Sequence, residues 1–195
     1  NFASGAMEAG IMNAAIHQLA KHIHIPNATS CGFSDSKLPD SQASWESGML
    51  VLAAAMGGTN IIRHASGGLL DRAMSLSLEQ IVMNDEIIGR ARRVIRGIDV
   101  DDAHIGVETI KEVGPGGSFI DTDQTFAFMR TEYYLGNGIT SRDSRDKWVE
   151  AGSKDTATRA KEMVKKLLSE KDETIIPDEL DRKIRHKYML NALTG

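Results

Sequence analysis

The sequence predicts an α/β fold in which a short parallel sheet is followed by a region of helices. Over residues 1–97 the patterns alternate as helix, strand, helix, strand, helix. Such alternation favours parallel strands joined by crossover helices, in an open sheet or a barrel. After Gly97 only helical patterns follow, and 195 residues are enough for one hydrophobic core.

The first helix and strand are predicted from the spacing of apolar residues. Before Pro26, apolar residues recur every three or four positions, at Ile11, Met12, Ala15, Ile16 and Leu19. Residues 27–33 form a short alternating segment typical of a buried strand, with Thr29, Cys31 and Phe33 on one face. The polar residues 34–40 then predict a loop above the end of that strand.

Two further helices and one strand complete the alternating part. Asp40 or Ser41 is expected to cap a helix that runs to about Met56. Residues 60–64 predict a second strand, followed by a turn at residues 66–68. Ser77 and Gln80 form a capping-box pattern, and a long amphipathic helix is predicted from there to Gly97.

The second half of the sequence is expected to be helical. The predicted helices or helical turns are residues 101–113, 122–134, 144–151, 155–169 and 178–190. Two convincing strands are few for a self-contained α/β domain. Because the first residue is Asn1 rather than methionine, we expect further sequence upstream.

Composition excludes several classes of protein. The 23 Lys and Arg residues against 27 Asp and Glu give a formal charge of -4, which provides no electrostatic reason to expect nucleic acid or an anionic membrane as partner. Cys31 is the only cysteine, so an intrachain disulfide framework and a thiolate zinc cluster are excluded. No segment resembles a signal peptide or a membrane span, and we expect a cytoplasmic protein.

Histidines and glycine turns carry weak functional signals. His17, His22 and His24 lack the i,i+4 spacing of a helical metal site, so no metal is expected there. Residues 114–117 read Gly-Pro-Gly-Gly, which predicts a helix end and turn, or backbone amides that approach a ligand. Residues 66–68 lack the patterns of nucleotide-binding loops, and an unrelated phosphate-binding barrel enzyme is a minor alternative.

The segment from Phe33 to Gln42 is the strongest local candidate for a site. It places two carboxylates, one ammonium group and one amide within ten residues after a strand. In a barrel, the carboxyl end of a strand is the active-site face. The alternative interpretation is a solvated loop with a helix cap.

Five ordered blocks of sequence resemble the trimethylamine methyltransferase family. They are residues 32–43, 67–70, 77–89, 96–98 and 112–117. Arg142, Asp143, Trp148 and residues 152–155 match the C-terminal region of that family. The resemblance covers nearly the whole chain but only the C-terminal portion of the family.

The resemblance implies a fold, an activity and partners. The fold would be the C-terminal part of a TIM-type (β/α)8 barrel followed by a helical tail, with residues 1–97 as the last βα units and residues 98–195 as a helical region of the same domain. The activity would be that of a corrinoid-dependent amine methyltransferase. Its partners would be a cognate corrinoid protein, which carries the cobalamin-type cofactor, and a small methylated amine. Nothing would be bound covalently, and we expect a homo-oligomer.

The resemblance also suggests the kind of substrate. By this resemblance, the pyrrolysine of trimethylamine-specific members falls in or beside residues 35–40, with Leu38 as the best placement, and leucine cannot capture an amine nitrogen. We therefore expect a quaternary amine of the betaine kind, which can release a neutral amine directly. Trimethylamine itself and a non-catalytic paralogue or assembly domain are the alternatives. No general-base pair is expected.

The remaining expected roles are assigned by position. The expected substrate-binding residues are Phe33, Asp35, Lys37, Asp40, Gln42, Arg63 and His64, with a buried, backbone-bonded His64 as the alternative for that residue. The residues expected to line or support the cavity or the corrinoid side are Gly67, Gly68, Glu79, Asp85, Gly116 and Gly117. No metal ligands are expected.

Overall fold

A computed structural model describes residues 3–170 and 176–188. Residue contacts divide the chain into two units, Asn1–Val164 and Lys165–Gly195. The predicted strands and the candidate site lie in the first unit.

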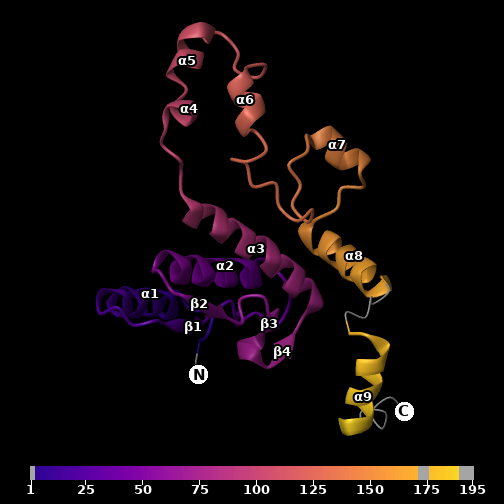
Figure 1. Cartoon of the computed structure of the whole chain (residues 1–195). Helices are drawn as coiled ribbons and strands as arrows, with labels where there is room; N and C mark the ends of the chain where they lie inside the picture. Colours follow the sequence, from indigo (N-terminus) through magenta and orange to yellow (C-terminus); the bar gives the residue numbers. More distant parts are fainter. Residues whose placement is uncertain (1–2, 171–175, 189–195) are drawn as a thin grey trace. The chain divides into compact units, whose positions relative to one another are not determined.

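Two parallel strands and three helices form the centre of the first unit, as the alternation predicted. Strand β1 (Ala28–Ser30) pairs in parallel with β2 (Ile61–Arg63). Helix α2 (Ser41–Met56) connects them and packs between α1 (Met7–His22) and α3 (Leu78–Arg96) (Figure 1). The α/β class is therefore confirmed, although the described residues do not form a closed barrel.

Only one of the two hydrogen bonds of the predicted capping box forms at the start of α3. The Ser77 hydroxyl accepts a hydrogen bond from the Gln80 amide at 3.1 Å, which satisfies one free N–H of the first turn. The reciprocal bond was predicted wrongly, because the Gln80 side chain donates to Asn84 Oδ1 at 2.8 Å. The Ser77 N–H instead donates to the carbonyl of Gly68 at 3.0 Å.

A small hairpin between β2 and α3 was not predicted. Strand β3 (Leu69–Leu70) pairs in antiparallel fashion with β4 (Ser75–Leu76). The connecting 3-10 turn η1 (Asp71–Ala73) has three consecutive non-glycine residues with left-handed backbone, at φ 46°, 59° and 67°. Two-residue strands are too short to show alternation, so the sequence gives no strand signal there.

The main core lies beneath α2, whereas the apolar face of α1 stays exposed. The buried core residues are Cys31, Leu50, Val51, Ala54, Ala65 and Ala91. The predicted stripe on α1 is different, since Ile11, Met12, Ile16 and Leu19 are 59–62 % exposed. Within the described part of the chain, nothing covers this stripe.

Burial of Cys31 leads to a prediction about its reactivity. Its side chain is 1 % exposed, and burial raises the pKa of the thiol to about 11. Because the thiolate is the reactive form, we expect Cys31 to resist alkylation in the folded protein at about pH 8 and to react after unfolding. Mass spectrometry of the Cys31 peptide measures both rates, and equal rates would contradict the burial.

The rest of the chain is helical, with corrections to two predicted helices. The helices are α4 (Asp102–Ile105), α5 (Val107–Val113), α6 (Asp123–Phe128), α7 (Arg145–Glu150), α8 (Thr156–Ser169) and α9 (Asp178–Tyr188). Gly106, with φ 66°, breaks the helix predicted over residues 101–113. The helix predicted over residues 122–134 ends at Phe128, and Leu190 lies outside the described residues. Among the described helices, none combines the length and the apolar character needed to cross a membrane.

Glu86 on α3 anchors the segment that follows α6. Its side chain is 6 % exposed and accepts hydrogen bonds from Asn137 N at 2.9 Å, Thr140 Oγ1 at 3.0 Å and Arg90 Nε at 3.0 Å. Burial by itself would raise the pKa of Glu86, but these donors together lower it below its ordinary value. A buried carboxylate therefore joins α3 to residues 137–140.

Candidate functional site

The loops after β1 and β2 meet at the carboxyl ends of the two parallel strands. Ser34 N donates to the carbonyl of Leu69 at 3.2 Å, and Arg72 N donates to the carbonyl of Ser34 at 3.1 Å. Asp71 N donates to the carbonyl of Ser36 at 2.8 Å. Backbone hydrogen bonds thus join the unpredicted hairpin to the predicted loop of residues 34–40. This is the edge of the sheet where α/β proteins bind ligands.

Gly32 allows the two loops to approach this closely. Its φ is 86°, and a Cβ at this position would lie 2.7 Å from the Cα of Ala65. A side chain here would therefore have to displace backbone rather than a flexible neighbour.

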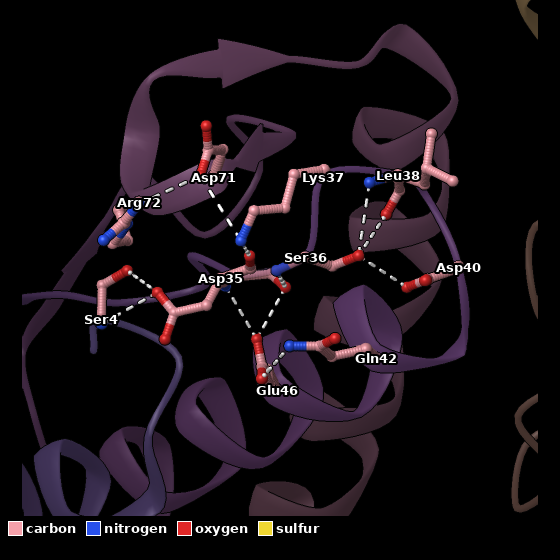
Figure 2. A network of polar contacts seen from close by, with 11 residues as sticks. Ser4, Asp35, Ser36, Lys37, Leu38, Asp40, Gln42, Glu46, Asp71 and Arg72 are labelled. Atoms are coloured by element: carbon pink, nitrogen blue, oxygen red, sulfur yellow. Dashed lines mark hydrogen bonds and ion pairs between the residues drawn. The ribbon is translucent and has the colours of Figure 1, made fainter. Parts of the chain in front are cut away.

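Glu46 on α2 holds the first loop from below, as Figure 2 shows. Its carboxylate accepts hydrogen bonds from the Ser34 hydroxyl at 2.7 Å, the Asp35 amide at 2.8 Å and Gln42 Nε2 at 2.8 Å. Ser34 is 1 % exposed, so this network is shielded from water on the loop side. Three donors on one carboxylate fix the course of the loop.

Asp40 fixes the other end of the loop. It caps α2 as predicted, since Oδ1 accepts from Ala43 N at 3.0 Å, and it also accepts from the Ser36 hydroxyl at 2.9 Å. The Ala43 amide is the main cause of a lowered pKa of Asp40. Between these anchors, Leu38 has its backbone bonded to Ser36 while its side chain is 65 % exposed.

Charged groups line the loop and the hairpin turn. Lys37 Nζ donates to the carbonyl of Asp35 at 2.7 Å and lies 3.6 Å from Asp71 Oδ1. Arg72 Nη2 lies 3.5 Å from the same oxygen. Asp35 Oδ1 accepts from both the backbone and the hydroxyl of Ser4, at 3.1 and 3.0 Å. Figure 2 shows these side chains around the segment from Asp35 to Leu38.

An aromatic pair adjoins this network. The Phe33 and His64 rings have centroids 5.6 Å apart and are tilted by 33°. His64 is exposed and has φ 69°, so the alternative of a buried His64 is wrong. Arg63, on β2, is also exposed.

The residues expected on the cavity side are not brought to this loop as one group. Gly68 lies against Ser77, and Gly67 N donates to the carbonyl of His64 at 2.8 Å. Glu79 accepts from the Ser77 hydroxyl at 2.9 Å; its own backbone amide, followed by that hydroxyl, lowers its pKa. Asp85 instead accepts from Asn137 Nδ2 at 3.0 Å, and Gly116 and Gly117 belong to the turn after α5.

A cavity of about 820 Å³ lies on another side of the α2 N-terminus. Its lining includes Asp40, Trp45, Glu86 and Arg90. Only Asp40 among them was expected to bind substrate.

One group of possible metal ligands occurs among the described residues. Asp99, His104 and Glu132 offer ligand atoms within 4.8 Å of one another. However, Glu132 pairs with Arg93 at 3.2 Å and with Arg96 at 2.7 Å. These two cations disfavour a bound dication, so the group forms an ion-pair network.

Sequence reasoning missed Ser4, Glu46, Asp71 and Arg72. Glu46 had a local signal, because Gln42 and Glu46 have the i,i+4 spacing that faces side chains on one helix surface. The other three come from segments whose contact with the loop depends on tertiary structure.

Comparison with known proteins identifies the family of this chain. A family model described as trimethylamine methyltransferase (MTTB) matches residues 1–191. The chain is 34 % identical over 180 residues to the trimethylamine methyltransferase MttB of Desulfitobacterium hafniense (strain DSM 10664 / DCB-2), covering 92 % of this chain and 35 % of that protein. It is 34 % identical over 177 residues to the Methanosarcina barkeri (strain Fusaro / DSM 804) enzyme of the same name, covering 91 % of this chain and 34 % of that protein.

A relative with a different named substrate also matches. The glycine betaine methyltransferase of Desulfitobacterium hafniense (strain Y51) is 30 % identical over 181 residues, covering 93 % of this chain and 37 % of that protein. All three of these relatives are named as methyltransferases. This chain belongs to the trimethylamine methyltransferase family, as the resemblance indicated, and spans about a third of the length of these curated relatives.

Proposed function

We propose that this chain is part of an enzyme that moves a methyl group from a quaternary amine to the Co(I) of a cognate corrinoid protein. In this proposal residues 1–97 supply the last βα units of a TIM-type barrel, and residues 98–195 supply a helical region of the same domain. Leu38 is the observation that carries the choice of substrate.

The chemistry of the leaving group explains why Leu38 matters. A quaternary ammonium releases a neutral amine, whereas neutral trimethylamine would have to leave as an amide anion unless an electrophile first captured its nitrogen. The exposed side chain of Leu38 is aliphatic and cannot form that bond. A donor that already carries four substituents on nitrogen needs no such residue.

The acceptor is the corrinoid of a separate protein, which supplies a nucleophilic cobalt. Leu38, 65 % exposed at the loop tip, has an aliphatic side chain without an atom that would ligate cobalt. The chain itself then has to bind and orient the amine, and such positioning is worth several kcal/mol of a barrier.

The loop residues suit a quaternary cation. The face of Phe33, held beside His64, can pack against methyl groups that carry positive charge. The carboxylate of Asp35, fixed by Ser4, adds negative charge beside it. Gln42 and Asp40 position the loop rather than contact the cation. Gln42 bonds to Glu46, and Asp40 caps α2.

Methyl transfer by the complete gene product tests the proposal. With a Co(I) corrinoid protein as acceptor, we expect methylation from glycine betaine and none from trimethylamine. Spectra of the corrinoid before and after reaction report the transfer. Methylation from trimethylamine alone would overturn the substrate choice.

Trimethylamine remains the second candidate because of the comparisons. Two relatives named for trimethylamine are 34 % identical, against 30 % for the relative named for glycine betaine. The same assay separates the two candidates, since each predicts a different active donor.

A further inference from the structure

We propose that Arg72, together with Lys37, binds a carboxylate on the methyl donor, so that the site selects betaines over quaternary amines without a carboxylate, such as choline. The inference rests on the proposed function for the reaction, but its binding step can be measured without methyl transfer.

Arg72 is held in place by its backbone while its side chain stays accessible. Its N–H donates to the carbonyl of Ser34, and the neighbouring Asp71 N–H donates to the carbonyl of Ser36. The Arg72 side chain is 40 % exposed and that of Lys37 is 67 % exposed. Both cationic groups are therefore accessible to a ligand from solvent.

The backbone of the turn at residues 71–73 is held in a strained conformation. Asp71, Arg72 and Ala73 all have positive φ without being glycine. Left-handed backbone at non-glycine residues is strained, and strain of this kind is concentrated at ligand-binding sites and active sites. Backbone hydrogen bonds to the first loop hold the turn in this conformation, which keeps Arg72 beside that loop.

The two cations at the turn are only loosely paired with Asp71. Asp71 Oδ1 is shielded from solvent and has no hydrogen-bond partner among the described residues. Lys37 and Arg72 approach it at 3.6 and 3.5 Å, which is longer than the usual 2.7–3.2 Å of N–H···O bonds. Two cations therefore share one carboxylate oxygen at the turn, and neither makes a short hydrogen bond to it.

The pattern of charge fits a zwitterion. Arg72 and Lys37 lie on the hairpin side of the loop, and the guanidinium can bind a carboxylate through two parallel hydrogen bonds. Asp35, bonded to Ser4, and the ring of Phe33 supply the environment for the cationic end. Choline has no carboxylate and would give the Arg72 guanidinium no anionic group of the ligand to bind.

Calorimetric binding of glycine betaine and choline to the full-length protein, without corrinoid protein, tests this inference. We expect the wild type to favour glycine betaine, and Arg72→Gln to weaken that binding by about tenfold or more while choline binding changes little. Arg185→Gln, which removes an exposed arginine paired with Asp181, is the matched control and should change neither. Equal weakening of both ligands, or no preference in the wild type, would overturn the proposal.

A second variant should act in the opposite direction. Asp71→Asn removes the carboxylate that competes for both cations, and asparagine tolerates positive φ. We expect tighter binding of glycine betaine, a gain that a poorly folded protein cannot produce; unchanged or weaker binding contradicts the inference. Betaine that binds selectively but yields no methyl transfer would support the carboxylate site and contradict the proposed reaction.

Discussion

Replacing Glu46 with alanine is expected to lower kcat/KM for methyl transfer about 100-fold in the full-length enzyme, because a loop displaced by about 1 Å can cost that much. Glu46 accepts hydrogen bonds from the Ser34 hydroxyl, the Asp35 amide and Gln42. Alanine would leave the buried Ser34 and the Asp35 N–H without their acceptor. The loss should fall on kcat more than on KM, since Glu46 orients the loop rather than the substrate.

The conservative variant Glu46→Gln separates positioning from a general loss of stability. Glutamine retains a carbonyl oxygen for Ser34 and Asp35, so it should recover most of the activity. Hydrogen exchange at the Asp35 amide should quicken in the alanine variant and stay slow in the glutamine variant. Glu108→Ala, which removes an exposed carboxylate paired with Lys111, should change neither measurement. Equal activity losses in the two Glu46 variants would contradict a positioning role.

Glu86→Ala is expected to reduce the free energy of unfolding by about 3 kcal/mol, since it leaves the Asn137 amide, Thr140 and Arg90 without their shared acceptor. Urea unfolding of the full-length protein and hydrogen exchange at the Asn137 amide measure this loss. Glu162→Ala, which breaks the exposed ion pair with Lys154, should cost less than about 1 kcal/mol. Similar losses in both variants would argue against a special role for Glu86.

The pH dependence follows from the lowered pKa of Glu86. A carboxyl group whose pKa is lower in the folded state contributes its stability above the unfolded value, here near 4.5, and loses it as pH falls through the folded value. The gap in stability between wild type and Glu86→Ala should therefore be complete at neutral pH and narrow in acid below about pH 4.5. A gap that is unchanged at acid pH would mean that the charge of Glu86 is not the stabilising feature.

Local signals predicted the part of the fold that depends on neighbouring residues. Asp40 was one of the two caps predicted for α2, because a capping side chain needs only an amide a few residues later, here that of Ala43. The strand at residues 28–30 and the loop after it were predicted from alternation and from a polar segment containing Pro39. The same local information placed Phe33, Asp35, Lys37 and the loop together at the end of the strand.

Features that depend on distant segments could not be predicted in this way. Arg72 lies beside the loop because of a turn with left-handed backbone. The turn contains no glycine, so the sequence gives no signal for it. Spacing identified the apolar stripe around Ile16 on α1, but spacing does not say what covers it, and the stripe is exposed in the described chain. Gly106 ended a helix that apolar spacing alone would have continued.

The contact between Gly32 and Ala65 constrains how this site can be altered. Because the backbone at Ala65 fills the space where a side chain at position 32 would project, a replacement loop that carries a side chain at position 32 would collide with the loop after β2. Recombination with a relative therefore has to keep glycine at position 32, or to exchange residues 32–40 and 64–76 together.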